Sequence, residues 1–207
     1  MMIVMASILC LSSCTKEKDE ATTLSTDYIE IYVGDTYLLT CNKENVTWQS
    51  DEKLIASVEK GLVKGVHVGQ TNIHVEDLTC IVKVKPHYNM FTEPSKNFGA
   101  SMTTIKNYMS SYTLRSEGSD YVTYYGTGKA LVYSYMFKAG KMNMSGFTVA
   151  VNDCMDLVEF LNERYLLVDA KKKSSSEYQY GYMSLDGIYA IVCDVSTTAG
   201  GLVTYNN

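Results

Sequence analysis

Hydrophobic and polar residues alternate in short runs between residues 28 and 84, and turn residues such as Gly34 and Gly69 separate these runs. Side chains of a strand point alternately to its two faces, so this pattern predicts strands with one buried face. The runs leave no room for helices, and we therefore expect a β-sandwich over residues 27–86. The expected strands are 28–33, 37–41, 46–48, 55–58, 61–66, 71–75 and 80–84.

The pattern changes after Pro86. Apolar residues recur at helical spacing in 98–109 and again in 153–164, and several strand-like runs follow each of these segments. A helix followed by strands, twice, predicts an α+β domain over residues 88–207 with an internal repeat. We expect its two helices to pack on an antiparallel sheet, so the whole chain is predicted to be mostly β with two domains. The expected strands are 121–125, 130–137, 146–151, 165–168, 177–183, 188–194 and 202–205.

Two rows of aromatic residues stand out in the second half of the chain, which contributes to a total of 17 Tyr. Alternation places the members of each row on one face of a strand. The rows are Leu131, Tyr133, Tyr135 and Phe137, and Tyr178, Tyr180 and Tyr182. We expect one row to form the core under the helices. The second row either packs in the sheet as well, which is the commoner outcome, or forms an open aromatic face that binds a glycan or a protein.

The N-terminus reads as an export signal. Residues 1–11 are almost wholly apolar, yet too few to span a bilayer as a helix, which takes about 20 residues. They end in Leu11-Ser12-Ser13-Cys14, which resembles the lipobox of bacterial lipoproteins, although no Lys or Arg precedes the apolar run. The resemblance implies that residues 1–13 are a signal peptide and that the Cys14 thiol carries a lipid anchor. The alternative is an N-terminal core segment that happens to contain a cysteine.

Charged and small polar residues dominate after Cys14 and predict a flexible tether over residues 14–26. Lysine and acidic residues directly after the lipidated cysteine also resemble the signal that moves some lipoproteins to the outer face of the outer membrane. The resemblance implies an outer membrane lipoprotein of the cell envelope that faces outward.

Several segments of the first domain, in order, resemble the group 2 bacterial immunoglobulin-like domain of intimin- and invasin-type surface proteins. The segments are Val33-Gly34-Asp35-Thr36, Val46-Thr47-Trp48-Gln49-Ser50, Ile55-Ala56-Ser57-Val58, Gly61-Leu62-Val63-Lys64-Gly65 and Gly69-Gln70-Thr71-Asn72-Ile73. The resemblance implies an immunoglobulin-like β-sandwich that acts as a spacer and adhesion module, without catalytic residues.

Four cysteines remain after the signal peptide and the lipidated residue, two in each domain. An exported protein lies in a compartment that permits disulfides. We therefore predict one bridge between Cys41 and Cys80 and another between Cys154 and Cys193. The alternative is four buried thiols that act as small apolar side chains.

Composition excludes several functions. A net charge of −5 argues against nucleic-acid binding, which needs clustered Lys and Arg. The three histidines are His67, His74 and His87, so the second domain cannot contain a Ser-His or Cys-His nucleophile. Catalytic, phosphate-binding and metal-ligand motifs are absent from the sequence. We predict no enzyme activity, no metal and no cofactor.

The leading hypothesis is a surface-exposed lipoprotein, held to the membrane by its N-terminal lipid, that acts as a non-catalytic binding or adhesion module for a glycan or a protein. The alternative is a periplasmic structural or assembly lipoprotein, or an inhibitor-like protein-binding domain. The helix-plus-strands outline is similar to that of periplasmic inhibitors and small assembly lipoproteins, a likeness of fold only.

Overall fold

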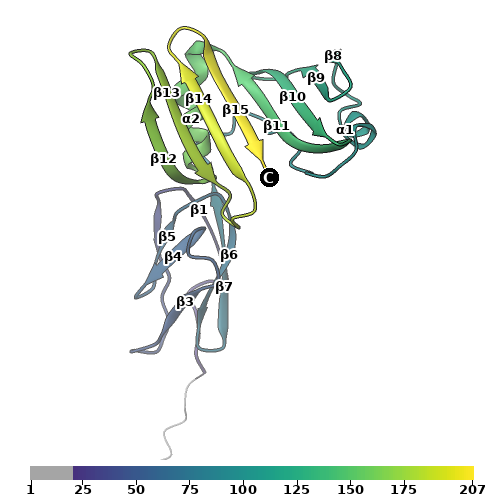
Figure 1. Cartoon of the computed structure of the whole chain (residues 1–207). Coiled ribbons are helices and arrows are strands. Elements are labelled where there is room, and N and C mark those ends of the chain that lie inside the picture. The colour runs from purple at the N-terminus through teal and green to yellow at the C-terminus, as the bar shows by residue number, and fades with distance from the viewer. Residues whose placement is uncertain (1–20) are drawn as a thin grey trace, which may run out of the picture.

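A computed structural model describes residues 21–207, and strands make up most of its regular structure, which confirms the mostly-β prediction. The predicted signal peptide, Cys14 and the first part of the predicted tether lie outside the described residues. None of the helices in the described part is long and apolar enough to cross a membrane. Two separate hydrophobic cores divide the chain into an N-terminal unit, up to residue 87, and a C-terminal unit, from residue 88 (Figure 1).

The N-terminal unit consists of two sheets that enclose one core. One sheet has the order β1-β7-β6-β3, with β1 parallel to β7, and the other has the order β2-β5-β4. In β7 the alternation expected from the sequence is complete, because Cys80, Val82 and Val84 are buried between exposed neighbours. The strands are β1 (Tyr28–Tyr32), β2 (Thr36–Leu38), β3 (Trp48–Ser50), β4 (Ala56–Glu59), β5 (Leu62–Gly65), β6 (Gly69–Val75) and β7 (Leu78–Lys85).

The end of the predicted tether belongs to the N-terminal unit. Leu24 forms a β-bridge with Cys41 and packs against the core, and the Ser25 backbone N–H donates to the Thr40 carbonyl at 2.9 Å. The tether prediction is therefore wrong for these last residues, because one leucine inside a polar stretch is enough to hold the backbone at a sheet margin.

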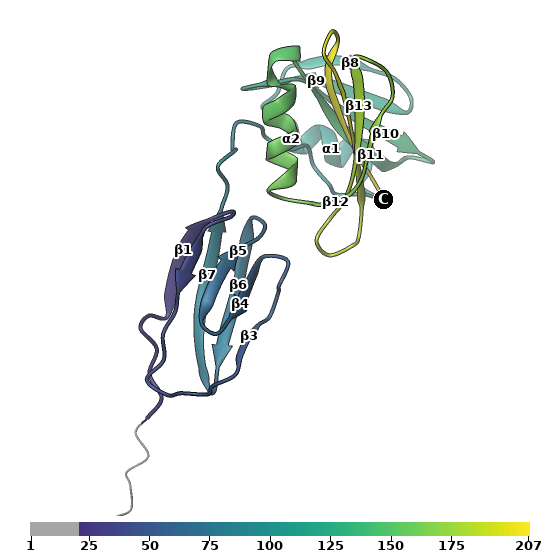
Figure 2. The ribbon, with the colours of Figure 1, turned by 90° about the vertical axis from the view of Figure 1, so that its left-hand side faces the viewer.

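The C-terminal unit is one antiparallel eight-stranded sheet with the order β12-β13-β14-β15-β11-β10-β9-β8. The predicted repeat is visible in this order, because α1 and α2 each precede four strands and the last strands of the two repeats, β11 and β15, pair at the centre. Both helices lie on one side of the sheet (Figure 2). The elements are α1 (Met102–Tyr108), β8 (Leu114–Glu117), β9 (Tyr121–Tyr125), β10 (Ala130–Lys138), β11 (Lys141–Val149), α2 (Cys154–Asn162), β12 (Leu166–Lys172), β13 (Glu177–Met183), β14 (Ala190–Ser196) and β15 (Gly200–Asn206).

The helix starts follow different rules. Ser101 caps α1 as its residue type suggests, because its hydroxyl accepts the Thr104 N–H at 3.1 Å. Asp153 precedes α2 but makes no side-chain cap, since its carboxylate pairs with Lys129 at 2.7 Å. At the start of α2 an ion pair with the turn between β9 and β10 thus takes the place of a side-chain cap.

A segment of residues 91–96, here called the strap, packs on the helix side of the sheet and is held by tyrosine hydroxyls. Tyr133 donates to the Thr92 carbonyl at 2.9 Å, and the Tyr135 hydroxyl accepts the Ser95 N–H at 3.2 Å. Phe91 packs edge-on against Phe160 of α2, and Glu93 and Pro94 line a small pocket with Tyr108 and Met109 at the end of α1, so the strap contacts both helices.

The strap also carries Glu93, whose carboxylate accepts hydrogen bonds from the hydroxyls of Tyr165 and Tyr205, the latter at 2.7 Å. Lys96 donates to the other carboxylate oxygen at 2.9 Å and to the Tyr165 hydroxyl at 2.7 Å. Burial and the nearby carboxylate raise the pKa of both tyrosines above the usual range, so both hydroxyls stay protonated and donate. The carboxylate is thus paired and hydrogen-bonded, as a charge in an interior must be.

The two units meet at Glu163, directly after α2. Its carboxylate accepts the backbone N–H groups of His87 at 2.8 Å and Tyr88 at 2.9 Å, and its own carbonyl accepts the Val68 N–H at 2.7 Å. The His87 ring stacks on Tyr32 with centroids 5.0 Å apart. One buried acidic residue therefore bonds the linker and a loop of the N-terminal unit to the end of a helix.

The substitution Tyr205→Phe tests the strap. It removes one of the hydroxyls that satisfy Glu93 in the interior, and a hydrogen bond to a charged group is worth about 2 kcal/mol. We expect a loss of about 2 kcal/mol in the free energy of unfolding, measured by urea denaturation. Tyr125→Phe is the matched control, because Tyr125 is exposed and should change stability by less than about 0.5 kcal/mol. Equal effects of the two substitutions would contradict the assigned role of Glu93.

Candidate functional site: the open face of the sheet

The side of the eight-stranded sheet away from the helices is uncovered by any other element of the described chain, and we call it the open face (Figure 2). Strand register places its side chains in rows that cross the sheet. One row is largely apolar and rich in methionine: Leu166, Met183, Ala190, Asn206, Met144, Met136 and Tyr121. Its members are partly or well exposed, with Met136 retaining 38% of its accessible surface.

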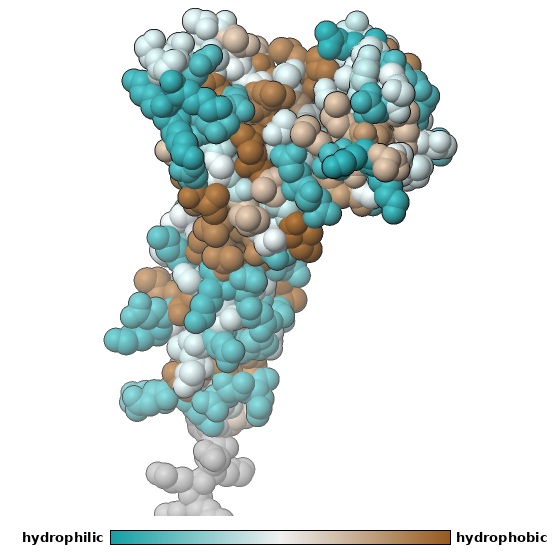
Figure 3. Space-filling model, viewed as in Figure 1, coloured by the Kyte–Doolittle hydropathy of each residue, from teal (hydrophilic) through white to brown (hydrophobic). Residues whose placement is uncertain are grey.

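The row beside it carries small side chains. Gly181, Val192, Thr204, Gly146, Ser134 and Thr123 follow one another across neighbouring strands. Because the side chains of this second row are short, the backbone of the sheet is accessible to another molecule beside the methionine row. In the space-filling view, apolar side chains run along the middle of this face between more hydrophilic flanks (Figure 3).

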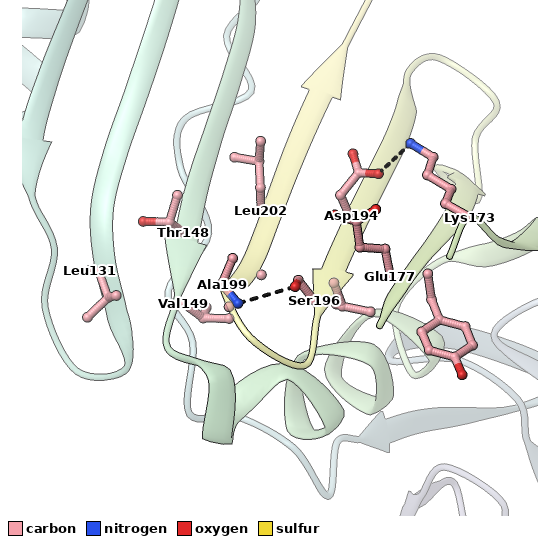
Figure 4. Close-up of a pocket in the computed structure, with 13 residues that line it drawn as sticks. Leu131, Thr148, Val149, Lys173, Glu177, Asp194, Ser196, Ala199 and Leu202 are labelled. Atoms are coloured by element: carbon pink, nitrogen blue, oxygen red, sulfur yellow. Dashed lines mark hydrogen bonds and ion pairs between the residues drawn. The ribbon is translucent and has the colours of Figure 1, made fainter. Parts of the chain in front are cut away.

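A groove of about 630 Å³ lies at one end of the open face, around the turn between β14 and β15. Leu131, Thr148 and Leu202 line one side of it, and Lys173, Glu177 and Asp194 line the other (Figure 4). One oxygen of Asp194 accepts bonds from Lys173 at 2.9 Å and from Gln179 at 2.8 Å. The groove therefore joins an apolar wall to a charged rim, an arrangement typical of protein interfaces.

The predicted aromatic ligand face is not open. Tyr182 keeps only 1% of its surface, and its hydroxyl donates to the Asn162 side chain of α2 at 3.0 Å. Tyr178 and Tyr180 are partly buried and pack against the same core, and Tyr178 also lines the groove. The row Tyr178, Tyr180 and Tyr182 thus lies on the helix side, together with Tyr133, Tyr135 and Phe137, and the commoner reading of sheet packing describes it.

One member of the other row departs from its prediction. Leu131 is 51% exposed, because the register shifts between Ala130 and Val132. A bulge adds one residue to a strand and turns the following side chains over. Leu131 therefore leaves the core row and lines the groove instead.

The disulfide prediction is wrong for this structure, in which Cys41, Cys80, Cys154 and Cys193 are all free thiols. Cys80 is fully buried in the N-terminal core, whereas Cys41 lies half-exposed at the sheet margin, where its sulfur accepts the Lys43 N–H.

The second cysteine pair is buried but not bridged. Cys154 directs its thiol to the Ala150 carbonyl at 3.6 Å, while Cys193 lies in the core row of β14. Both residues act as small apolar side chains, which is the alternative that the sequence left open.

Sequence reasoning followed the tyrosines and missed the methionines. The signal was present in the chain, since Met136 and Met183 occupy the positions next to Tyr135 and Tyr182, and neighbours in a strand point to opposite faces. Among residues 21–207, no three histidine, cysteine or acidic side chains gather in a way that could hold a metal ion.

Comparisons with protein-family models, with curated proteins and with solved structures found no match for this chain.

The thiols differ in predicted reactivity. Burial raises the pKa of Cys80, Cys154 and Cys193, which suppresses their reactive thiolate forms, whereas Cys41 is half-exposed. At pH 8 we expect Ellman's reagent to label Cys41 in the native protein, and the other three only after denaturation. A Cys41→Ser variant should lose the native signal. If these cysteines stay unreactive in the denatured protein until a reductant is added, they are bridged and the disulfide prediction is correct.

Proposed function

We propose that this chain is an exported lipoprotein, held to a membrane by lipid on Cys14, that binds a protein partner with the open face of its C-terminal unit. The Leu11-Ser12-Ser13-Cys14 sequence supports the lipid anchor. The described chain begins at the end of the N-terminal unit that lies away from the C-terminal unit (Figures 1 and 2). An anchor at that end would keep the open face clear of the membrane, facing outward.

The N-terminal unit would serve as an immunoglobulin-like spacer. Its seven short strands, in two sheets around one core, agree with such a sandwich, and its sequence resembles the bacterial members of that group. Glu163 and the linker would then fix the direction in which the spacer presents the open face.

The observation that carries the binding role is the uncovered face itself. The methionine row crosses seven of the eight strands and the row of small residues crosses six, where a sheet of a protein without a partner usually presents polar side chains. Methionine is flexible and polarizable, which suits contact with another protein surface. The charged rim around Asp194 and Lys173 would add specificity.

A protein fits this face better than a glycan. Sugar rings stack on flat aromatic side chains, and the two open-face rows described above hold one aromatic residue, Tyr121 of β9, which does not line the groove. The methionine row offers mainly apolar contact, with few polar groups that could match a sugar. The expected role is therefore non-catalytic binding of a protein.

Site-specific photocrosslinking in the native host tests the binding role. A benzophenone amino acid in place of Met136, on the open face, should give a discrete protein adduct. The control is the same replacement of Met155, a methionine of α2 that is 68% exposed on the helix side and should give none. Thr204→Arg, at the centre of the open face, should abolish the Met136 adduct. If neither position gives an adduct and the chain binds selectively on a glycan array, the ligand is a sugar and not a protein.

Lipidation makes a separate prediction. Growth with an alkyne-labelled fatty acid should label the wild-type chain but not Cys14→Ser, since the lipid is expected on that thiol. Cys41→Ser is the matched control and should be labelled like the wild type. If Cys14→Ser still takes up the fatty acid, the anchor assignment is wrong, while the crosslinking result at Met136 would stand independently.

A further inference from the structure

The two edges of the eight-stranded sheet differ in length and protection. β8 is a four-residue strand, and its Glu117 is held by Lys106 of α1 at 2.7 Å. β12, at the opposite edge, has seven residues, all exposed, and pairs only with β13. An exposed edge offers unpaired N–H and C=O groups to another chain, and long edges of this kind are rare without protection.

Two residues of β12 present their backbone groups outward. The Lys173 N–H donates to the Glu177 carbonyl at 2.9 Å, so Lys173 faces β13. Backbone groups alternate in direction along an antiparallel strand, and therefore Ala170 and Lys172 point their N–H and C=O groups away from β13. An added strand would bond to these two residues.

The side chains of β12 define the chemistry of the occupant. Leu166, Leu167 and Val168 form an exposed aliphatic half. In the other half Lys171 pairs with Asp169 at 2.6 Å, whereas Lys172 has no carboxylate within ion-pair distance among residues 21–207. The edge thus combines a stretch of aliphatic surface with one uncompensated positive charge.

We propose that β12 accepts an extended segment of a protein partner as a ninth strand, with an acidic residue beside Lys172 and aliphatic residues beside Leu166 and Leu167. Backbone bonds would supply affinity and these side chains the selectivity. A second copy of β12 is a poorer occupant. When two edge strands pair antiparallel, the residues whose backbone groups point outward lie opposite one another. Lys172 of one copy would therefore lie opposite an uncharged residue or opposite Lys172 of the other copy, and never opposite Asp169. Of the residues that define this edge, only Leu166 also belongs to the methionine row of the open face.

A designed peptide tests the edge with the purified full chain. The probe is an amidated nine-residue peptide with threonine at every second position, starting from the first. Two glutamates occupy the remaining positions of its first half and two valines those of its second half, which suits antiparallel pairing with β12. In an amide NMR titration we expect saturable shifts at Ala170 and Lys172, with a dissociation constant of about 1 mM or tighter. The same peptide, N-methylated at four consecutive central residues, should give no shifts, because it cannot form the backbone bonds.

Two variants separate backbone pairing from charge. Ala170→Pro removes an outward N–H without removing a bond to β13, a place where an edge strand tolerates proline, and should weaken binding about tenfold. Lys172→Glu should weaken it about fivefold. Lys138→Glu is the matched control, since Lys138 is an exposed lysine of β10 that forms no ion pair with any residue in 21–207, and should change binding by less than about twofold.

Several results would overturn the proposal. One is equal binding of the N-methylated peptide, and another is equal binding by Lys172→Glu and the wild type. A dimer of the wild-type chain that Ala170→Pro abolishes, seen by sedimentation equilibrium, would assign the edge to self-association. The amide signals of residues outside β12 show whether each variant keeps its fold. If Ala170→Pro disturbs the fold, Lys172→Glu still tests the proposal, because it does not change the backbone.

Discussion

Buried tyrosine hydroxyls need hydrogen-bond partners, and the strap of residues 91–96 supplies them. Tyr133 and Tyr135 bond to its backbone, and Tyr165 and Tyr205 bond to the carboxylate of Glu93. A buried hydroxyl without a partner would cost roughly 1–3 kcal/mol, so the rings can fill the core only while the strap is in place. The many tyrosines of the C-terminal unit are therefore explained mainly by packing rather than by ligand binding.

This constraint makes the two faces of the sheet different. The helix side takes up the large rings, both helices and the strap, whereas the other side keeps methionines and small residues and is covered by no other element of the described chain. The repeat adds to the asymmetry, because β11 and β15 meet in the middle and leave β8 and β12 as edges. A broad face and a long free edge are thus two results of one arrangement, and both are surfaces on which another protein could pack.

Glu163 connects the C-terminal unit to the linker and to the N-terminal unit. Its carboxylate holds the linker backbone at His87 and Tyr88, and its carbonyl holds Val68 of the N-terminal unit. Removing either type of bond would leave backbone N–H groups at this joint without their partner. Under the proposed function, this joint sets how far from the membrane, and in which direction, the open face is presented.

Alternation along the chain was enough to predict most strands, both helices and the repeat, because side-chain direction in a strand or helix is a local property. The bulge that exposes Leu131, the strap under Tyr135 and the side to which Tyr182 turns were not, since each depends on contacts between residues far apart in the chain. Proximity in space also decided the cysteines, because two thiols in one compartment form a bridge only when the fold brings them together at the right geometry. The sequence by itself thus determined which residues share a face. Only the tertiary structure decided which face the helices cover and which is left open, because that choice depends on how the two repeats pack together.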